Sequence, residues 1–427
     1  MQNPDNARDT LAEEEFGLDE LTAPAPDQNP DENAFYRHES LERRGGNAPP
    51  QEAEGRTDPT SRWLTQLYII SYLIFFSIFG VLARIGLQAL TLYPGALVGN
   101  SDLWANFGGS LLIGMLREDR MLFRRHWRRE LQNARGDISM SSEDTDEHAP
   151  RKSLKDAARA PYATAISGVP AYIGMTVGFC GSFTSFASVC RDAFLAIADK
   201  LDTARVSTSV TLASHRARSA GDSVMALLAV LLLEVGLSII GLNLGAHLAS
   251  GLARPSEKIP VWNLSRFMDP LFVLLGPGCW LGAILLVIWP VHNAWRGQAL
   301  FALVFAPVGC LVRFQLSVRL NRLARAFPIG TFAANVLGTC ILGLAYDLQM
   351  SSAGTATLSC QVLMGIMDGF CGALTTVSTW VLELDTLSLR HAYFYGLCSL
   401  FIGVGFITVI MGSLLWTTGF RTPSCKL

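Results

Sequence analysis

The polar residues that could do chemistry in this chain are concentrated in a short stretch that occurs twice, at residues 178–188 and 369–379. Each copy begins with Gly-Phe-Cys-Gly and continues into a run of serine and threonine hydroxyls. Because glycine adopts backbone angles that other residues resist, the paired glycines predict a helix that breaks within the stretch. A break at membrane depth is tolerated only where the freed amides and carbonyls face protein, water or an ion. Each copy is therefore a candidate ion site.

Two further polar residues recur with each copy. Gly-Val-Leu-Ala-Arg at 80–84 matches Gly-Cys-Leu-Val-Arg at 309–313, and an asparagine follows each arginine by 22 residues, at Asn106 and Asn335. Glycines then lie three and eight residues after each asparagine. These coincidences are independent of one another, so they indicate an internal duplication.

The recurring asparagines and arginines admit more than one role. A buried asparagine can bond a neighbouring helix or present N–H groups to an anion, and its recurrence beside a helix break favours the anion. For Arg84 and Arg313 we favour a structural role, because arginine near a helix end often bridges polar backbone. Glu234 and Ser238 lie one turn apart, and we favour a bond from Glu234 to a neighbouring helix over a transport role.

The hydroxyl groups that follow the glycines can also act in two ways. They can bond back to their own helix, or they can form a polar track that donates to a passing anion. Aromatic rings beside such a track would present an electropositive edge to the anion. The hydroxyl residues are Thr184, Ser185, Ser188, Thr375, Thr376, Ser378 and Thr379.

The rest of the sequence indicates what positions these residues. Half of the residues are hydrophobic and 16% are charged, and the apolar residues form blocks of about 20, the length of a membrane-spanning helix. We therefore predict an all-α integral membrane protein. The net charge of −2 gives no sign of nucleic-acid binding. The seven histidines and nine cysteines lack metal-ligand spacing and no catalytic motif is visible, so an enzyme is not expected.

The apolar blocks predict nine membrane crossings. They lie at about residues 68–90, 103–116, 168–198, 224–248, 271–290, 300–320, 329–346, 358–386 and 393–416. We divide them into four helices, one linking helix and four more helices. Because the single linking helix crosses the membrane once, the second unit has the opposite membrane orientation to the first. We therefore predict two four-helix inverted-topology repeats, each with a broken third helix.

These units divide the chain. We expect a disordered polar tail at 1–62, the first unit at 63–252 with a disordered loop at 117–161, a linker with one helix at 253–296, the second unit at 297–418 and a short tail at 419–427. Loop 117–161 carries eleven basic residues, which predicts a cytoplasmic loop and a cytoplasmic N-terminus.

Taken together, the motifs resemble those of the Fluc (CrcB) fluoride channels and their fused eukaryotic relatives, the FEX fluoride exporters. That family has Gly-x-x-x-Arg in its first helix, Gly-Thr-x-x-x-Asn-x-x-Gly in its second and Gly-Phe-x-Gly-x-x-Thr-Thr-Phe-Ser-Thr-Phe in its third. Residues 330–335 match the second motif, whereas residues 101–106 keep only its asparagine. The resemblance covers nearly everything between about residues 67 and 416 and omits the N-terminal tail and the long loop.

The resemblance implies a structural sodium ion between the two broken helices. In the family, backbone carbonyls of the second glycine and the first threonine of the third motif hold this ion. The corresponding residues here are Gly181, Thr184, Gly372 and Thr375. Backbone carbonyls suit a small hard cation.

The resemblance also implies two anion pathways, each lined by one aromatic residue from each unit. The family places phenylalanine at four positions that are Phe186, Val189, Val377 and Trp380 here. Phe186 would share one pathway with Trp380, and Val377 would share the other with Val189. We therefore expect one working pathway, the aromatic one, and one degenerate pathway.

Other pathway residues follow from the same comparison. The family has an acidic residue three positions after the second phenylalanine of the third motif, which corresponds to Asp192 and Glu383 here. A tyrosine and a serine of its last helix correspond to Tyr395 and Ser399. The candidate pathway residues are Phe186, Trp380, Asn106, Asn335, Ser188, Thr376, Ser378, Thr379, Tyr395 and Ser399.

The function that the resemblance implies is a passive fluoride-selective channel. It would act as a single fused chain in the plasma membrane and export fluoride from the cytoplasm for fluoride resistance. The alternative is a coupled secondary transporter of fluoride or another small anion, since inverted repeats with broken helices also occur in transporters. A noncatalytic membrane scaffold is a third hypothesis, which predicts no anion flux.

Overall fold

The computed structural model describes residues 59–91, 102–118, 168–201, 219–252, 264–290, 292, 296–324, 326–351 and 356–421. Across these ranges the chain forms helices and connecting turns, without a strand. Three expected segments lie wholly or largely outside the described residues. They are the polar tail as far as residue 58, the loop at 117–161 beyond residue 118, and the last six residues.

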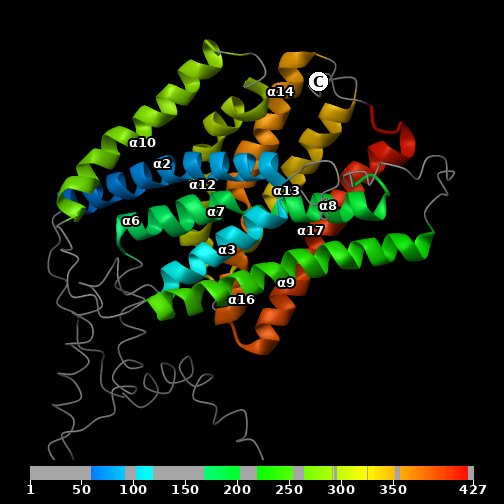
Figure 1. Cartoon of the computed structure of the whole chain (residues 1–427), viewed down its shortest axis with the longest axis horizontal. Helices are drawn as coiled ribbons and strands as arrows, with labels where there is room; N and C mark the ends of the chain where they lie inside the picture. Colours follow the sequence, from blue (N-terminus) through cyan, green and yellow to red (C-terminus); the bar gives the residue numbers. More distant parts are fainter. Residues whose placement is uncertain are drawn as a thin grey trace, which may run out of the picture. The chain divides into compact units, whose positions relative to one another are not determined.

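The helices follow the expected order of two units and a linker (Figure 1). The first unit contains α2 (Pro59–Thr91), α3 (Leu103–Glu118), α6 (Pro170–Ile173), η4 (Gly174–Cys180), α7 (Gly181–Phe183), α8 (Phe186–Ile197) and α9 (Ala220–Leu252). The linker is α10 (Leu264–Ile288). The second unit contains η5 (Arg296–Leu300), α12 (Phe301–Leu320), α13 (Ile329–Met350), α14 (Thr357–Gly365), η7 (Ile366–Cys371), α15 (Gly372–Leu374), α16 (Ser378–Thr386) and α17 (Leu389–Thr417).

Within the described ranges, eight helical segments are long and apolar enough to cross a membrane. The one expected crossing that is not among these eight is the second in the chain, α3, which has 16 residues. At 1.5 Å per residue it extends about 24 Å, less than the ~30 Å of a bilayer core. Large apolar side chains face outward, such as Leu274 on α10 at 74% exposure and Phe401 on α17 at 75%. An outer apolar surface of this kind suits lipid, and the chain is an all-α multi-pass membrane protein.

Small residues allow close contact between neighbouring helices. In the first unit α3 lies along α9, with Gly114 against the backbone of Leu242 (Figure 1). The linker α10 packs on α2, where the Tyr72 hydroxyl donates to Asp269 Oδ1 over 3.0 Å. In hydrophobic surroundings such close backbone approaches, together with buried hydrogen bonds, hold helices together.

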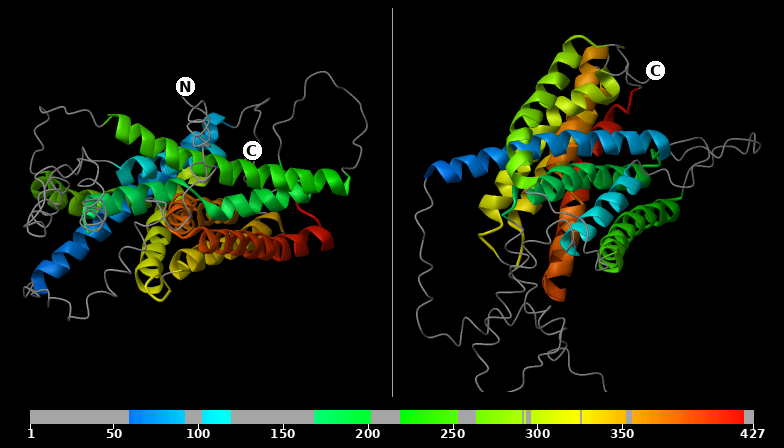
Figure 2. Two further views of the ribbon diagram at one scale, coloured as in Figure 1. Left: turned by 90° about the horizontal axis from the view of Figure 1, so that it is seen from below. Right: turned by 60° about the vertical axis from the view of Figure 1, so that its left-hand side comes forward.

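The two units are in contact through α2 with α12 and through their broken third helices, and their helices cross one another (Figure 2). The contacts are reciprocal. Arg84 of the first unit bonds the carbonyl of Asp368 in the second, and Arg313 of the second bonds the equivalent carbonyl, that of Val177, in the first. Reciprocal contacts of this kind are the mark of a two-fold relationship.

Both third helices are broken, but the break lies later than the glycines suggest. Residues 174–180 and 366–371 form wide π-type turns, and the helix is interrupted at Thr184 and at Thr375, three residues after the second glycine of each copy. Gly181 and Gly372 themselves have ordinary right-handed angles. The expectation that glycine conformational freedom causes the break was therefore wrong. These glycines are needed for close approach, because the guanidinium groups of Arg313 and Arg84 lie where their side chains would be.

Candidate functional site

Each helix break is capped by the asparagine of its own unit. The backbone at Thr184 is extended, with φ −98° and ψ 154°, and at Thr375 it is nearly the same, with φ −95° and ψ 153°. The amide of the next residue is freed and donates to the asparagine side-chain oxygen. Ser185 N lies 2.9 Å from Asn106 Oδ1, and Thr376 N lies 2.8 Å from Asn335 Oδ1. Both asparagines thus satisfy buried backbone groups that the break would otherwise leave unpaired.

Each unit also caps the broken helix of the other unit. Thr184 Oγ1 accepts from the amides of Val377 and Ser378 at the start of α16, both at 3.2 Å. Thr375 Oγ1 accepts from the amide of Ala187 at the start of α8, at 3.1 Å. Hydroxyl oxygens are preferred at helix N-termini because the first amides have no intrahelical acceptor. The two units are therefore interlocked at their centre.

The remaining hydroxyls continue this buried cluster. Ser185 Oγ lies 2.9 Å from Ser188 Oγ and 3.3 Å from Thr375 Oγ1. In the second unit Thr376 Oγ1 lies 3.3 Å from Ser378 Oγ and 3.4 Å from Thr379 Oγ1. Bonds back to the same helix occur as well, since Thr184 Oγ1 also contacts the carbonyl of Cys180 at 3.1 Å. The bond back to the same helix is therefore present, and the hydroxyls also bond one another across the two units. Their use as donors to an anion stays a prediction.

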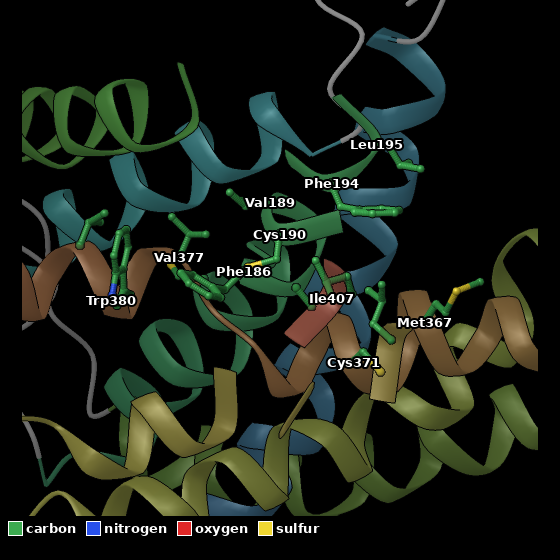
Figure 3. Packing of buried hydrophobic residues seen from close by; sticks show 14 of the residues in the cluster. Phe186, Val189, Cys190, Phe194, Leu195, Met367, Cys371, Val377, Trp380 and Ile407 are labelled. Atoms are coloured by element: carbon green, nitrogen blue, oxygen red, sulfur yellow. The ribbon is translucent and has the colours of Figure 1, made fainter. Parts of the chain in front are cut away.

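The expected aromatic pair is in contact. The rings of Phe186 and Trp380 lie 5.4 Å apart between centroids at 64°, an edge-to-face arrangement, and both side chains are buried (Figure 3). Phe186 lies against Gly403 and Trp380 against Gly396, and both glycines belong to α17. Within the described part of the chain, the buried indole Nε1–H of Trp380 has no hydrogen-bond partner.

The face of α17 that meets these rings carries a polar network. Tyr395 donates its hydroxyl to Glu383 Oε2 over 2.7 Å, and Thr331 donates to Glu383 Oε1 over 2.6 Å. Ser399, one turn further, donates to the carbonyl of Tyr395. α17 and α13, which carries Asn335, both pack on α8 of the first unit. We call this set the aromatic route: Phe186, Trp380, Asn335, Tyr395 and Ser399.

The equivalent positions around α9 carry different residues and adjoin the aromatic pair. α3 and α9 of the first unit pack on α16 of the second, mirroring the contacts of α13 and α17 with α8. Val189 and Val377 line a small hollow together with Glu234 of α9 and Leu400 of α17, and Phe186 and Trp380 line it too. Figure 3 shows the two valines beside the two rings. We call this set the aliphatic route: Val189, Val377, Asn106, Glu234 and Ser238.

Glu234 has the role that its sequence context favoured. Asn106 Nδ2 donates to Glu234 Oε2 over 2.9 Å, which joins α3 to α9, and the Glu234 side chain is 1% exposed. Its place beside the hollow was not foreseen. The signal was present, because Glu234 and Ser238 have the same spacing on α9 as Tyr395 and Ser399 on α17.

The two family-acid positions differ in their partners. Asp192 forms an ion pair with the guanidinium of Arg191 at 2.8 Å, whereas Glu383 accepts from two hydroxyls. Asp102 stands at the position equivalent to Thr331 and accepts a bond from Gln88. Sequence reasoning missed Arg191 and Asp102, although the absence of the Gly-Thr pair at 101–102 marked this place as altered.

The structural role favoured for the arginines is confirmed. Arg313 Nη2 donates to the carbonyl of Val177 over 2.7 Å, and Arg84 donates to the carbonyl of Asp368. Both arginines are buried, at 2% and 1% exposure. A buried guanidinium is stabilised by polar backbone of this kind, so these residues hold the two broken helices together.

Four backbone carbonyls at the break have lost their usual helical donors. In a continuous helix the amides of Ser185 and Thr376 would bond the carbonyls of Gly181 and Gly372, but here they bond the side chains of Asn106 and Asn335. Likewise, the amides of Ser188 and Thr379 would bond the carbonyls of Thr184 and Thr375, but they bond the hydroxyls of Ser185 and Thr376. α7 and α15, which begin with the two glycines, are in contact. Clusters of acidic, histidine or cysteine side chains suited to a metal were not found among the described residues. The oxygen ligands that the break itself offers are these four carbonyls.

Comparison with known families agrees with the duplicated architecture. A family model described as CrcB-like protein, Camphor Resistance (CrcB), matches residues 71–246 and 300–419, more than half of the chain. This chain belongs to the CrcB-like family. The two matched ranges of this CrcB-like chain coincide with the two four-helix units, and the linker α10 lies between them.

Curated relatives extend the comparison. This CrcB-like chain is 45% identical to fluoride export protein 1 of Neurospora crassa, over 94% of this chain and 82% of the relative. It is 32% identical to fluoride export protein 1 of Candida albicans, over 83% of this chain and 82% of the relative. A bacterial fluoride-specific ion channel FluC from Geotalea uraniireducens is 42% identical over 20% of this chain and 66% of the relative. No solved structure matches the chain significantly.

Proposed function

We propose that this protein is a passive fluoride channel that exports fluoride from the cytoplasm. Its membership of the CrcB-like family and its similarity to two fungal fluoride export proteins and a fluoride-specific ion channel support this function. Hydrogen fluoride crosses membranes uncharged and dissociates at neutral pH, so the trapped anion leaves through a channel down its own gradient. No energy-coupling step is required.

The aromatic route carries the proposal. Phe186 and Trp380 meet edge to face beside α17, and the Trp380 N–H is a buried donor without a partner in the described ranges. An unsatisfied buried donor costs about 1–3 kcal/mol, and an arriving anion would satisfy it. Electropositive ring edges and hydroxyl donors can replace part of the water shell that a small anion loses.

We infer that only the aromatic route conducts. In the aliphatic route Val189 and Val377 take the places of the rings. Aliphatic side chains offer a dehydrated anion neither a polar edge nor a hydrogen bond, so transfer through this route carries the full desolvation penalty. Because each route takes residues from both units, the single fused chain is the functional protein in this proposal.

The proposed location is the plasma membrane, with a cytoplasmic N-terminus. The excess of basic residues in loop 117–161 favours this orientation, since basic loops remain on the cytoplasmic side. Fluoride that dissociates in the cytoplasm would then leave the cell directly.

We also propose a structural sodium ion held by carbonyls of Gly181, Thr184, Gly372 and Thr375. The diversion of their usual amide donors fits such an ion, because hard cations prefer oxygen ligands. The guanidinium groups of Arg84 and Arg313 lie close to the two glycines and would oppose a cation. When bound, the ion would fix the two breaks relative to each other.

Fluoride efflux from liposomes that contain the purified protein tests the function. A fluoride-selective electrode should record rapid efflux that is absent with chloride and unchanged by a proton gradient. Dependence on a proton gradient at slow turnover would instead favour the coupled transporter. No flux of either anion from well-folded protein would leave the scaffold hypothesis.

A further inference from the structure

The fourth helices of the two units carry equivalent but different polar pairs. On α17 the pair is Tyr395 and Ser399, and on α9 it is Glu234 and Ser238, in both cases one turn apart. α17 packs on α8 of the opposite unit, and α9 packs on α16 of the opposite unit. A carboxyl group therefore stands in the aliphatic route where a neutral hydroxyl stands in the aromatic route.

The surroundings of Glu234 show what this carboxyl group does. Its Oε2 takes the Nδ2 donor of Asn106, whereas the equivalent donor of Asn335 makes a longer bond of 3.2 Å to the carbonyl of Thr376. Glu234 also lines the hollow between the units, on the side of Val189 and Val377 and next to Phe186 and Trp380, which line it as well. Nearby, the buried hydroxyl of Ser238 has no hydrogen-bond partner within the described residues, although its equivalent Ser399 is bonded.

We propose that Glu234 is a tethered anion that closes the aliphatic route to fluoride. This inference rests on the proposed function and adds a second cause of closure to the loss of the rings. The carboxyl group occupies the amide donor that a passing fluoride would use, and its ionised form would repel a second anion in a region of low dielectric. A tyrosine hydroxyl, being neutral, would leave the same position open.

The two causes can be separated by rebuilding the rings first. The starting variant combines Phe186→Ile, which disables the aromatic route, with Val189→Phe and Val377→Phe, which give the aliphatic route the rings of the family pattern. To this variant we add Glu234→Gln, which keeps the size and removes the charge, or Glu234→Tyr, which supplies the residue of the aromatic route. Glu234→Asp is the matched control, because it keeps the charge.

Fluoride efflux from liposomes, with chloride as the control anion, gives the result. The starting variant and its Glu234→Asp form should remain closed, while the Gln or Tyr form should conduct at least about tenfold faster, because a like charge in a low-dielectric path has been removed. Equal efflux with and without the carboxylate would overturn the proposal. So would closure of both neutral forms when they elute as single species and keep the helical circular dichroism of the parent.

The unmodified chain, measured in parallel, separates this inference from the proposed function. If the unmodified chain transports no fluoride, the proposed function fails before Glu234 is in question. If it transports fluoride and the neutral variants stay closed, only the inference about Glu234 fails.

Discussion

The guanidinium group of Arg313 lies in the space that a side chain on Gly181 would fill, so the first unit holds open a place for an arginine of the second. Gly372 receives Arg84 in the same way. We expect Gly181→Ala to displace the guanidinium from the carbonyl of Val177 and to destabilise the fold by about 1–3 kcal/mol or more, as overpacking does.

Thermal unfolding in detergent measures this effect. Gly236→Ala is the matched control, because Gly236 lies within α9 and has no atom near the space of an added Cβ. A Gly181→Ala variant as stable as the Gly236→Ala variant would show that the arginine can move aside without cost.

Phe186→Ile should abolish fluoride efflux, because it removes the ring that meets Trp380 beside α17. Val189→Ile makes a similarly small change in the aliphatic route and should barely alter the rate. Electrode recordings from liposomes with matched protein content compare the two. The opposite ranking would reject the assignment of the working route.

Trp380→Phe should separate the ring from its N–H group. The variant keeps an aromatic edge but loses a buried donor. Fluoride should still pass, but the fluoride concentration that gives half-maximal efflux should rise. A lost hydrogen bond of about 1 kcal/mol would raise this half-saturating concentration roughly fivefold. An unchanged concentration dependence would mean that the indole N–H does not meet the anion.

The two asparagines should respond unequally to replacement by aspartate. Asn335→Asp and Asn106→Asp both keep an oxygen for the freed backbone amide, so both caps can persist. Only Asn335→Asp places a negative charge in the aromatic route, and it alone should stop efflux. Equal loss in both variants, with folding intact, would argue that both asparagines serve one route.

Sodium removal should weaken transport if carbonyls of the two breaks hold a cation. Replacing sodium on both sides of the liposome with a large organic cation is expected to slow fluoride efflux, and returning sodium should restore it. Lithium and potassium serve as size controls. Efflux that does not depend on the cation would remove the sodium ion from the proposal.

The sequence was sufficient for the architecture, because the signals that define it are local or periodic. The two units and their broken third helices follow from apolar blocks and from the spacing of arginine, asparagine and glycine. Family resemblance placed Phe186 with Trp380, and the rings do meet.

Other features depend on contacts between distant residues and could not be predicted. The break occurs at Thr184 because Ser185 N is captured by Asn106, 79 residues earlier. The Gly-Phe-Cys-Gly glycines were misassigned to backbone freedom because the arginine that requires Gly181 lies in the other unit. Glu234 was recognised as a helix partner, but its place beside the hollow depends on the packing of α9 against α16.

The exchange of threonine caps between Thr184 and α16, and between Thr375 and α8, makes each half a component of its neighbour's conduit. Separately expressed halves should therefore be inert alone and regain activity only when mixed. If only the aromatic route conducts, the amino-terminal half still cannot be discarded, because that route takes Phe186 from it.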